Sequence, residues 1–237
     1  MFVGHLGVGF VAGSADRRVP LWAWIGASFV PDLLWPLLLL AGVEQVRVDP
    51  GNTRFTGLAF DSYPWSHSLV LVLAWGAIAA VVAARATGAR RTALLVGAVV
   101  VSHWGLDALA HRPDLPLWPG GPLAGLGLWD SVAATLAVEG ALFACGIAAW
   151  LRVARPHGTA GRIAFWGLVA LAGGAWLTQP WAPPPPSAAA VGVGGLANWL
   201  LPAWAWWIGR TAAYDAVRFA ASRFAPVSRP SAAGDPP

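Results

Sequence analysis

Long apolar segments separated by short arginine-containing loops constrain the fold of this chain more than any other feature of its sequence. A helix rises about 1.5 Å per residue, so it needs about 20 consecutive apolar residues to cross a membrane. The sequence therefore predicts an all-α fold, a polytopic membrane helical bundle with about six spans. The predicted spans are residues 19–43, 66–84, 92–110, 129–151, 163–179 and 191–208.

The two ends of the chain differ from these segments. Residues 2–13 are apolar but too short to cross a bilayer, which predicts a half-depth helix at the amino terminus. We expect residues 1–209 to form a single membrane-embedded helical domain. Beyond it, residues 210–225 carry arginines between apolar positions, which predicts an amphipathic surface helix on anionic lipid. The last residues, to 237, are expected to form a disordered tail.

The composition supports this class of protein. Of the 237 residues, 57% are hydrophobic and 11% are charged, whereas a soluble domain carries about 25% charged residues. The positive charge comes from arginines scattered over short loops, so we expect no nucleic-acid partner. The expected partners are the lipid bilayer and a small-molecule or lipid substrate, and the sequence carries no signal for an oligomeric state.

The arginines predict how the chain is oriented. One predicted side of the membrane carries only Arg47, Arg54 and Arg112. Because loops rich in arginine stay in the cytoplasm, we expect an integral protein of a bacterial-type inner membrane with a cytoplasmic carboxy terminus. The arginines predicted to be cytoplasmic are Arg17, Arg18, Arg85, Arg90, Arg91, Arg152, Arg155, Arg162, Arg210, Arg218, Arg223 and Arg229.

A stripe of ionisable residues ends one of the apolar segments. His103, Asp107 and His111 follow one another at steps of four, which places them on one slowly drifting face of a helix. His and Asp side chains suit zinc or a similar divalent ion. The structural alternative is a polar stripe in a helix–helix seam, but ionisable groups within a membrane span are costly and usually functional.

Three further residues are candidate ligands. His5 lies in the half-depth helix, and His67 begins the span after the first long loop. Asp32 follows Pro31, and a bend at Pro31 or Pro36 would free backbone carbonyls and make room for a ligand. Under the arginine orientation, these residues reach the same outer half of the membrane as the stripe. The predicted metal ligands are His5, Asp32, His67, His103 and Asp107.

Other acidic residues and His111 are predicted to have roles other than binding the first metal ion. Asp130 is expected to cap the helix that begins near it, and Glu139 is a buried candidate that accepts a hydrogen bond from a ligand histidine. The alternative for Glu139 is a protonated carboxyl without a catalytic role. Asp61 or Asp32 could accept a proton. His111 lies about 12 Å along the helix from His103, which suits a second ion or an anionic substrate beside Arg112.

Several of these residues lie in motifs that resemble those of a known protein family. Gly4-His5, Pro31-Asp32, Ser66-His67-Ser68-Leu69, and Ser102-His103 followed by Asp107 and Leu117-Trp118-Pro119 resemble the signature of the LexA-regulated, membrane-bound, predicted metal-dependent hydrolases. That family is distantly similar to the zinc-dependent phospholipase C and P1 nuclease group, which implies hydrolysis of phosphate esters. The resemblance covers roughly residues 1–119, and the chain departs from it at Leu34, where a second acidic residue is usual.

The sequence thus favours a membrane-bound metal-dependent hydrolase that acts on a phosphate ester or lipid-derived substrate near the outer interface. One or two divalent ions, with zinc favoured, would polarise the substrate and activate water. The catalytic candidates beside the ligands are Asp32, Asp61, His111 and Glu139. Two alternatives remain: a proton-coupled transporter or channel, with ionisable groups spread over the whole membrane depth, and a non-catalytic membrane scaffold.

Overall fold

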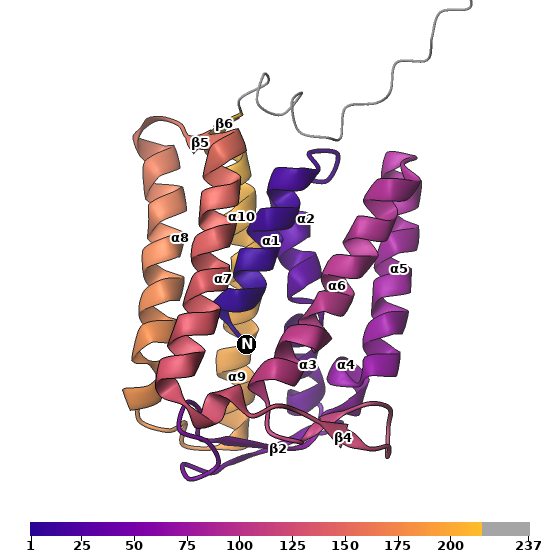
Figure 1. The fold of residues 1–237 in the computed structure, drawn as a ribbon, viewed down its shortest axis with the longest axis vertical. Helices are drawn as coiled ribbons and strands as arrows, with labels where there is room; N and C mark the ends of the chain where they lie inside the picture. The colour runs from indigo at the N-terminus through magenta and orange to yellow at the C-terminus, as the bar shows by residue number, and fades with distance from the viewer. Residues whose placement is uncertain (215–237) are drawn as a thin grey trace, which may run out of the picture.

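The computed structural model describes residues 1–214, which form a bundle of helices with three small pairs of strands (Figure 1). The α-helices are α1 (Val3–Ala15), α2 (Leu21–Ser28), α3 (Val30–Leu40), α4 (Pro64–His67), α5 (Leu69–Thr87), α6 (Arg90–Ala110), α7 (Val132–Val153), α8 (Gly158–Thr178), α9 (Ala188–Gly195) and α10 (Leu200–Thr211). Short 3-10 turns are η1 (Leu128–Asp130), η2 (Gln179–Trp181) and η3 (Leu196–Trp199).

The apolar helices confirm the predicted fold class. Five helices are long and apolar enough to cross a membrane, or up to 6 if the bent pair of α2 and α3 counts as one span. In α5, only 17% of the most apolar window is buried inside the protein. An apolar helix that is mostly uncovered is suited to lipid rather than to water. The predicted short amino-terminal helix is α1, which begins near mid-height of the bundle (Figure 1).

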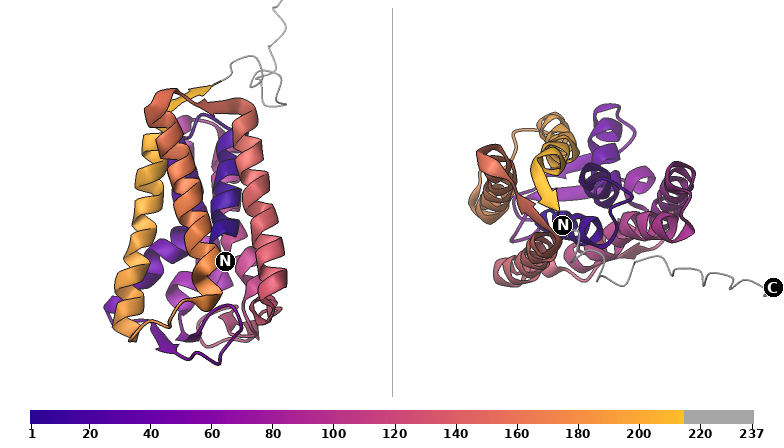
Figure 2. Two further views of the ribbon diagram at one scale, coloured as in Figure 1. Left: turned by 90° about the vertical axis from the view of Figure 1, so that its left-hand side faces the viewer. Right: turned by 90° about the horizontal axis from the view of Figure 1, so that it is seen from above.

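The bundle has two unlike ends (Figures 1 and 2). At one end lie the connections from α1 to α2, α5 to α6 and α7 to α8, with the strand pair of β5 (Ala154–Pro156) and β6 (Ala212–Tyr214). The described arginines predicted to be cytoplasmic lie in these connections, in β5 or in the helix ends that adjoin them, so we call this end the arginine-rich end. The opposite end carries the hairpins β1 (Gln45–Val48) with β2 (Leu58–Ser62) and β3 (Leu115–Pro116) with β4 (Leu123–Ala124).

The bend between α2 and α3 lies before both prolines. The two helices are inclined by 59°, and the break is at Phe29, not at Pro31 or Pro36. Pro31 falls in the first turn of α3, where its missing N–H group breaks no helical hydrogen bond. Pro36 lies inside α3 without ending it. The predicted bend is therefore present, but it is displaced, and it leaves the carbonyl of Ser28 at the break.

Two local predictions need correction. Ser131, rather than Asp130, caps α7, because its side chain accepts a hydrogen bond from the Ala134 N–H group. The surface helix predicted from residue 210 does not begin there: Arg210 and Thr211 finish α10, and residues 212–214 form β6. The remainder of that predicted helix and the predicted tail lie outside the described residues.

Candidate metal centre

The predicted ligands come together from four helices. α1 contributes His5, α3 contributes Asp32, α4 contributes His67, and α6 contributes both His103 and Asp107. They form two groups, His5 with His103 and Asp107, and Asp32 with His67 and His103, in which the ligand atoms lie within 4.8 Å of one another. All but Asp32 are almost fully buried. The structure therefore brings residues that are up to about a hundred positions apart in sequence into one cluster.

Four separations among Asp32, His67, His103 and Asp107 are near those of ligands around one ion. His103 Nε2 lies 3.1 Å from Asp107 Oδ2 and 3.8 Å from Asp32 Oδ1. His67 Nε2 lies 3.5 Å from Asp32 Oδ1 and 3.7 Å from Asp107 Oδ2. Ligands at about 2.0–2.2 Å from a tetrahedral ion are separated by about 3.3–3.6 Å. Asp32, His67 and His103 thus form one close group, and Asp107 adjoins it through His67 and His103. Two imidazoles with carboxylate oxygens are a donor set that suits a divalent ion.

The helix break fixes the orientation of His103. Ser28 is the last residue of α2, and its carbonyl oxygen lies 2.8 Å from His103 Nδ1. A hydrogen bond donated by Nδ1–H to this carbonyl leaves the lone pair on Nε2, which is buried and has no hydrogen-bond partner of its own. Such a contact is the usual way in which a protein sets the tautomer of a metal-binding histidine. Because only Nε2 is available, His103 can bind one ion, not two.

A buried carboxylate that the sequence did not reveal orients His67. Its Nδ1 lies 2.7 Å from Ser66 Oγ, and the Ser66 hydroxyl donates to Glu44 Oε2 at 2.7 Å. Glu44 Oε1 also accepts hydrogen bonds from the N–H groups of Trp65 and Ser66, so the carboxylate is held at several points. The chain from Glu44 through Ser66 leaves His67 Nε2 free to bind an ion. Glu44 gave no sequence signal beyond being an acid at the end of an apolar segment.

Removing the hydrogen bonds that link Glu44 through Ser66 to His67 is expected to weaken metal binding. In a Ser66→Ala variant, His67 Nδ1 loses its acceptor, and the imidazole is free to rotate or change tautomer. Loss of such an orienting partner typically reduces metal affinity about 10–100-fold. Zinc competition titrations of the purified protein measure this change.

Ser102→Ala is the matched control for that experiment. Ser102 directly precedes His103, but its hydroxyl donates to the Val99 carbonyl of its own helix and contacts no ligand. Equal zinc affinities in the Ser66→Ala and Ser102→Ala variants would show that the Glu44–Ser66 chain does not support the site.

His5 contacts the other side of the Asp107 carboxylate. Its Nε2 lies 3.1 Å from Asp107 Oδ1, and its ring stacks on that of His103 with centroids 3.7 Å apart. The Met1 amino group also contacts Asp107 Oδ1. Asp107 Oδ2 thereby faces His67 and His103, while Oδ1 is held from the α1 side. This geometry suits His5 as the residue that orients Asp107, or as a ligand to an ion shared with Oδ1.

Glu139 lies beside the cluster, but its hydrogen-bond partners differ from the predicted ones. It is fully buried in α7, and its Oε2 accepts hydrogen bonds from the N–H groups of Phe2, at 2.9 Å, and Gly4, at 3.5 Å. These N–H groups belong to the first turn of α1, where a carboxylate also interacts favourably with the helix dipole. Its hydrogen bonds in the described structure thus include no histidine. Glu139 Oε1 is buried without a hydrogen-bond partner.

A cavity of about 210 Å³ adjoins the cluster. Asp32, His67, Asp107 and Glu139 contribute to its wall together with aromatic side chains of α3, β2 and η1. The aromatic residues are Trp35 of α3, Phe60 of β2 and Trp129 of η1, with Phe2 before α1 and Phe55 in the loop before β2. No arginine is among the described residues that line it. A mainly apolar cavity that meets a few converging polar groups is the usual form of a small-molecule site.

His111 lines the same cavity at the end of α6. Its Nδ1 lies 2.9 Å from Asp114 Oδ1, and the Tyr63 hydroxyl also contacts Asp114, at 3.2 Å. Burial raises the pKa of Tyr63 well above its ordinary range, and the negative charge of Asp114 raises it further, so the phenol stays protonated and donates. The ring of His111 packs against Trp129 with centroids 4.3 Å apart. His111 is thus placed to contact a molecule in the cavity and lies outside both groups of ligand atoms.

Two other predicted contacts are not formed at the site. Asp61 accepts hydrogen bonds from Arg47 at 2.7 and 3.0 Å across the exposed β1–β2 hairpin. Cross-strand pairing thus directs Asp61 to Arg47, and Asp61 is not among the described residues that line the cavity, so its role as a proton acceptor stays a prediction. Arg112 donates to the backbone and side-chain oxygens of Asn52, so it does not line the cavity beside His111.

Comparisons of the chain with models of known families, with curated proteins and with solved structures gave no match.

Proposed function

We propose that this protein is a membrane-bound metal-dependent hydrolase whose centre holds one divalent ion through Asp32, His67, His103 and Asp107. The observation that carries the proposal is the close spacing of these ligand atoms beside a cavity that Asp32, His67 and Asp107 help to line. Zinc is the ion we favour, because two imidazoles and two carboxylates suit it in a small four-ligand site. Family resemblance over residues 1–119 supports a hydrolase acting on phosphate esters.

In the proposed centre, different residues have different roles. A divalent ion held there supplies a Lewis acid that polarises the bond under attack and activates water. Ser28 and the Glu44–Ser66 chain hold the two imidazoles in the tautomer that presents Nε2. Glu139 Oε1 lacks a hydrogen-bond partner, so we assign it as the group that takes up a proton. The aromatic walls exclude bulk water and cover an apolar part of the substrate.

The placement of the buried ionisable residues supports a site rather than a proton relay. A relay through the membrane needs such groups across the whole depth. In the described part of the chain, the other buried ionisable residues lie in the parts of α1, α6 and α7 away from the arginine-rich end, or in the segments that adjoin the hairpins: His5, Glu44, His67, His103, Asp107, His111 and Glu139. The buried Asp16 at the other end accepts hydrogen bonds from Thr92 and Arg18, which satisfy it locally.

Turnover tests the proposed reaction. Zinc-loaded protein in nanodiscs is expected to hydrolyse either bis(p-nitrophenyl) phosphate or phosphatidic acid, followed by nitrophenol or phosphate release. Glu139→Gln is expected to retain its zinc and to lose about 100-fold or more of the rate, the usual contribution of a positioned proton acceptor. No turnover of either compound above that of an Asp107→Asn variant would refute a phosphoesterase.

We further propose that the arginine-rich end is cytoplasmic in a bacterial-type inner membrane, so that the cavity lies in the outer half. The arginines of the described connections support this orientation by the positive-inside rule. In a Cys145→Ala background, which removes the exposed native thiol, an impermeant maleimide added to intact cells is expected to label Ala182→Cys but not Thr159→Cys. The reverse labelling pattern would invert the orientation.

A further inference from the structure

Two carboxamides of the carboxy-terminal half belong to the wall of the cavity beside the metal centre. Gln179, at the start of η2, and Asn198, in η3, line this cavity together with Asp32 and His67. Both side chains are partly exposed, and neither carboxamide has a hydrogen-bond partner among the described residues. They lie beyond residues 1–119, so the family resemblance does not include them. The four proposed ligands do not include them either, so their place in the wall needs another explanation.

The depth of Asn198 makes an unpaired amide costly. Asn198 lies near the middle of the apolar segment Ala188–Thr211, which is long enough to cross a membrane. An amide that faces hydrocarbon loses its hydrogen bonds to water, so polar side chains at this depth face a cavity or a partner. At the same place α9 gives way to the 3-10 turn η3, and such an interruption within a helical segment often marks a functional position.

Close packing against α3 fixes the position of η3. A Cβ atom on Gly195 would lie 3.0 Å from Pro36 Cβ, so a side chain at this position would push the end of α9 away from α3. The Trp199 indole N–H group donates a hydrogen bond to the Leu33 carbonyl at 3.1 Å. Leu33 directly follows the candidate ligand Asp32. The η3 turn and its carboxamide are therefore held beside the part of α3 that belongs to the metal centre.

The wall of this cavity offers hydrogen bonds without a guanidinium charge. No arginine is among the described residues that line it, and its acidic members are Asp32, Asp107 and Glu139. A carboxamide has both donor and acceptor atoms, as a hydroxyl group has, so the two can exchange hydrogen bonds. A substrate that bears hydroxyl groups would satisfy Gln179 and Asn198, whereas a quaternary ammonium group would leave both carboxamides unpaired.

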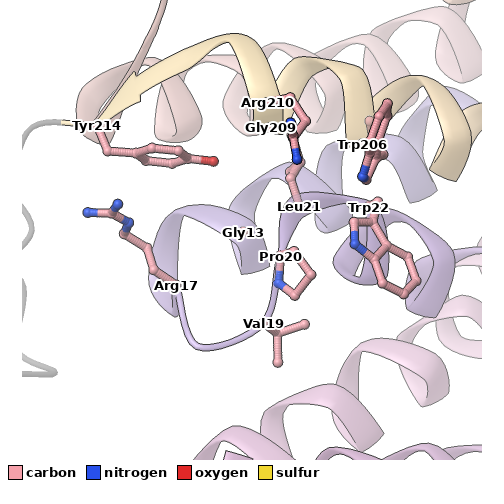
Figure 3. Close-up of a pocket in the computed structure, with 11 residues that line it drawn as sticks. Gly13, Arg17, Val19, Pro20, Leu21, Trp22, Trp206, Gly209, Arg210 and Tyr214 are labelled. Carbon is pink, nitrogen blue, oxygen red and sulfur yellow. The ribbon is translucent and has the colours of Figure 1, made fainter. Parts of the chain in front are cut away.

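We infer that Gln179 and Asn198 bind the hydroxyl groups of an uncharged, glycerol-like alcohol in the ester that is cleaved. This inference rests on the proposed function and adds a substrate class to it, a phosphate ester whose alcohol carries further hydroxyl groups. A separate hollow of about 300 Å³ at the arginine-rich end (Figure 3) has no histidine, acid or amide among the described residues that line it. That hollow therefore offers neither the imidazole and carboxylate ligands nor the carboxamides.

Binding of two matched diesters tests this inference. The probes are the glycerol and choline diesters of p-nitrophenyl phosphate, which share the aryl group and the phosphate and differ in the second alcohol. Zinc-loaded Glu139→Gln protein in nanodiscs, which is expected to cleave them slowly, should bind the glycerol diester about tenfold more tightly in isothermal titration calorimetry. Asn198→Leu and Gln179→Leu, each added to that protein, should weaken its binding about five- to tenfold and leave the zinc content unchanged.

Gln45→Leu is the matched control, because it makes the same change at an exposed residue of β1 outside the cavity. It should leave the affinities for both diesters unchanged. Equal affinity for the two diesters before these changes, or unchanged affinity in both Asn198→Leu and Gln179→Leu, would overturn the inference. Preferential binding of the glycerol diester without turnover by protein that keeps Glu139 would instead refute the hydrolase and support the binding role of the two carboxamides.

Discussion

Purified His103→Ala protein is expected to contain less than about a tenth of the metal found in the wild type, which should hold about one ion per chain. His103 Nε2 belongs to both groups of candidate ligands, and it lies 3.1 Å from Asp107 Oδ2 and 3.8 Å from Asp32 Oδ1. Alanine removes the one nitrogen that the two groups share. Elemental analysis of protein purified in detergent, normalised to protein concentration, measures the stoichiometry.

The experiment needs a control for the loss of any histidine. His157→Ala serves, because His157 lies in the exposed connection before α8 and belongs to neither ligand group. Asp107→Asn adds a second test at the site, since asparagine keeps the shape of the side chain but removes the charge that binds the ion. Stoichiometric metal in folded His103→Ala and Asp107→Asn proteins, as judged by size exclusion and circular dichroism, would refute the assigned centre.

The sequence predicted the ligands because their positions follow simple local rules. His103 and Asp107 are one helical turn apart in an apolar segment, where ionisable side chains must be paired or functional. A proline beside Asp32 indicated the bend that brings α3 against the cluster. Each of these signals lies within a few residues of its target. The structure adds how closely the separate segments meet, with ligand atoms within 4.8 Å of one another in each group.

The supporting contacts were not predictable in the same way. Glu44 reaches His67 only because the loop after α3 returns it to α4, and no periodicity in the sequence encodes that return. The Ser28 carbonyl becomes an acceptor because the helix breaks at Phe29, two residues before Pro31. Glu139 was recognised as buried and polar, but its partners are backbone N–H groups, which have no residue-specific signature. Tertiary contacts with the main chain are thus the part that sequence patterns miss.

The packing of α1 against α7 depends on two glycines. A Cβ atom on Gly146 would lie 2.3 Å from the carbonyl oxygen of Gly7, and one on Gly7 would lie 2.4 Å from the carbonyl oxygen of Leu142. Side chains cannot relieve these contacts, because the clashing atoms are backbone. Small residues at such positions allow membrane helices to approach closely. The same approach brings Glu139 of α7 to the first turn of α1, which carries His5.

Gly146→Ala is therefore expected to separate α1 from α7 and to destabilise the protein. Overpacking of a tight contact costs about 1–3 kcal/mol, which corresponds to a fall of about 2–12 °C in Tm for a chain of this size. Metal affinity should fall as well, since α1 positions His5 against Asp107. Gly174→Ala on α8 is the matched control, because its Cβ atom would meet nothing within 4 Å. Equal melting temperatures for the two variants in the same detergent would show that α1 and α7 are not held together by this close contact.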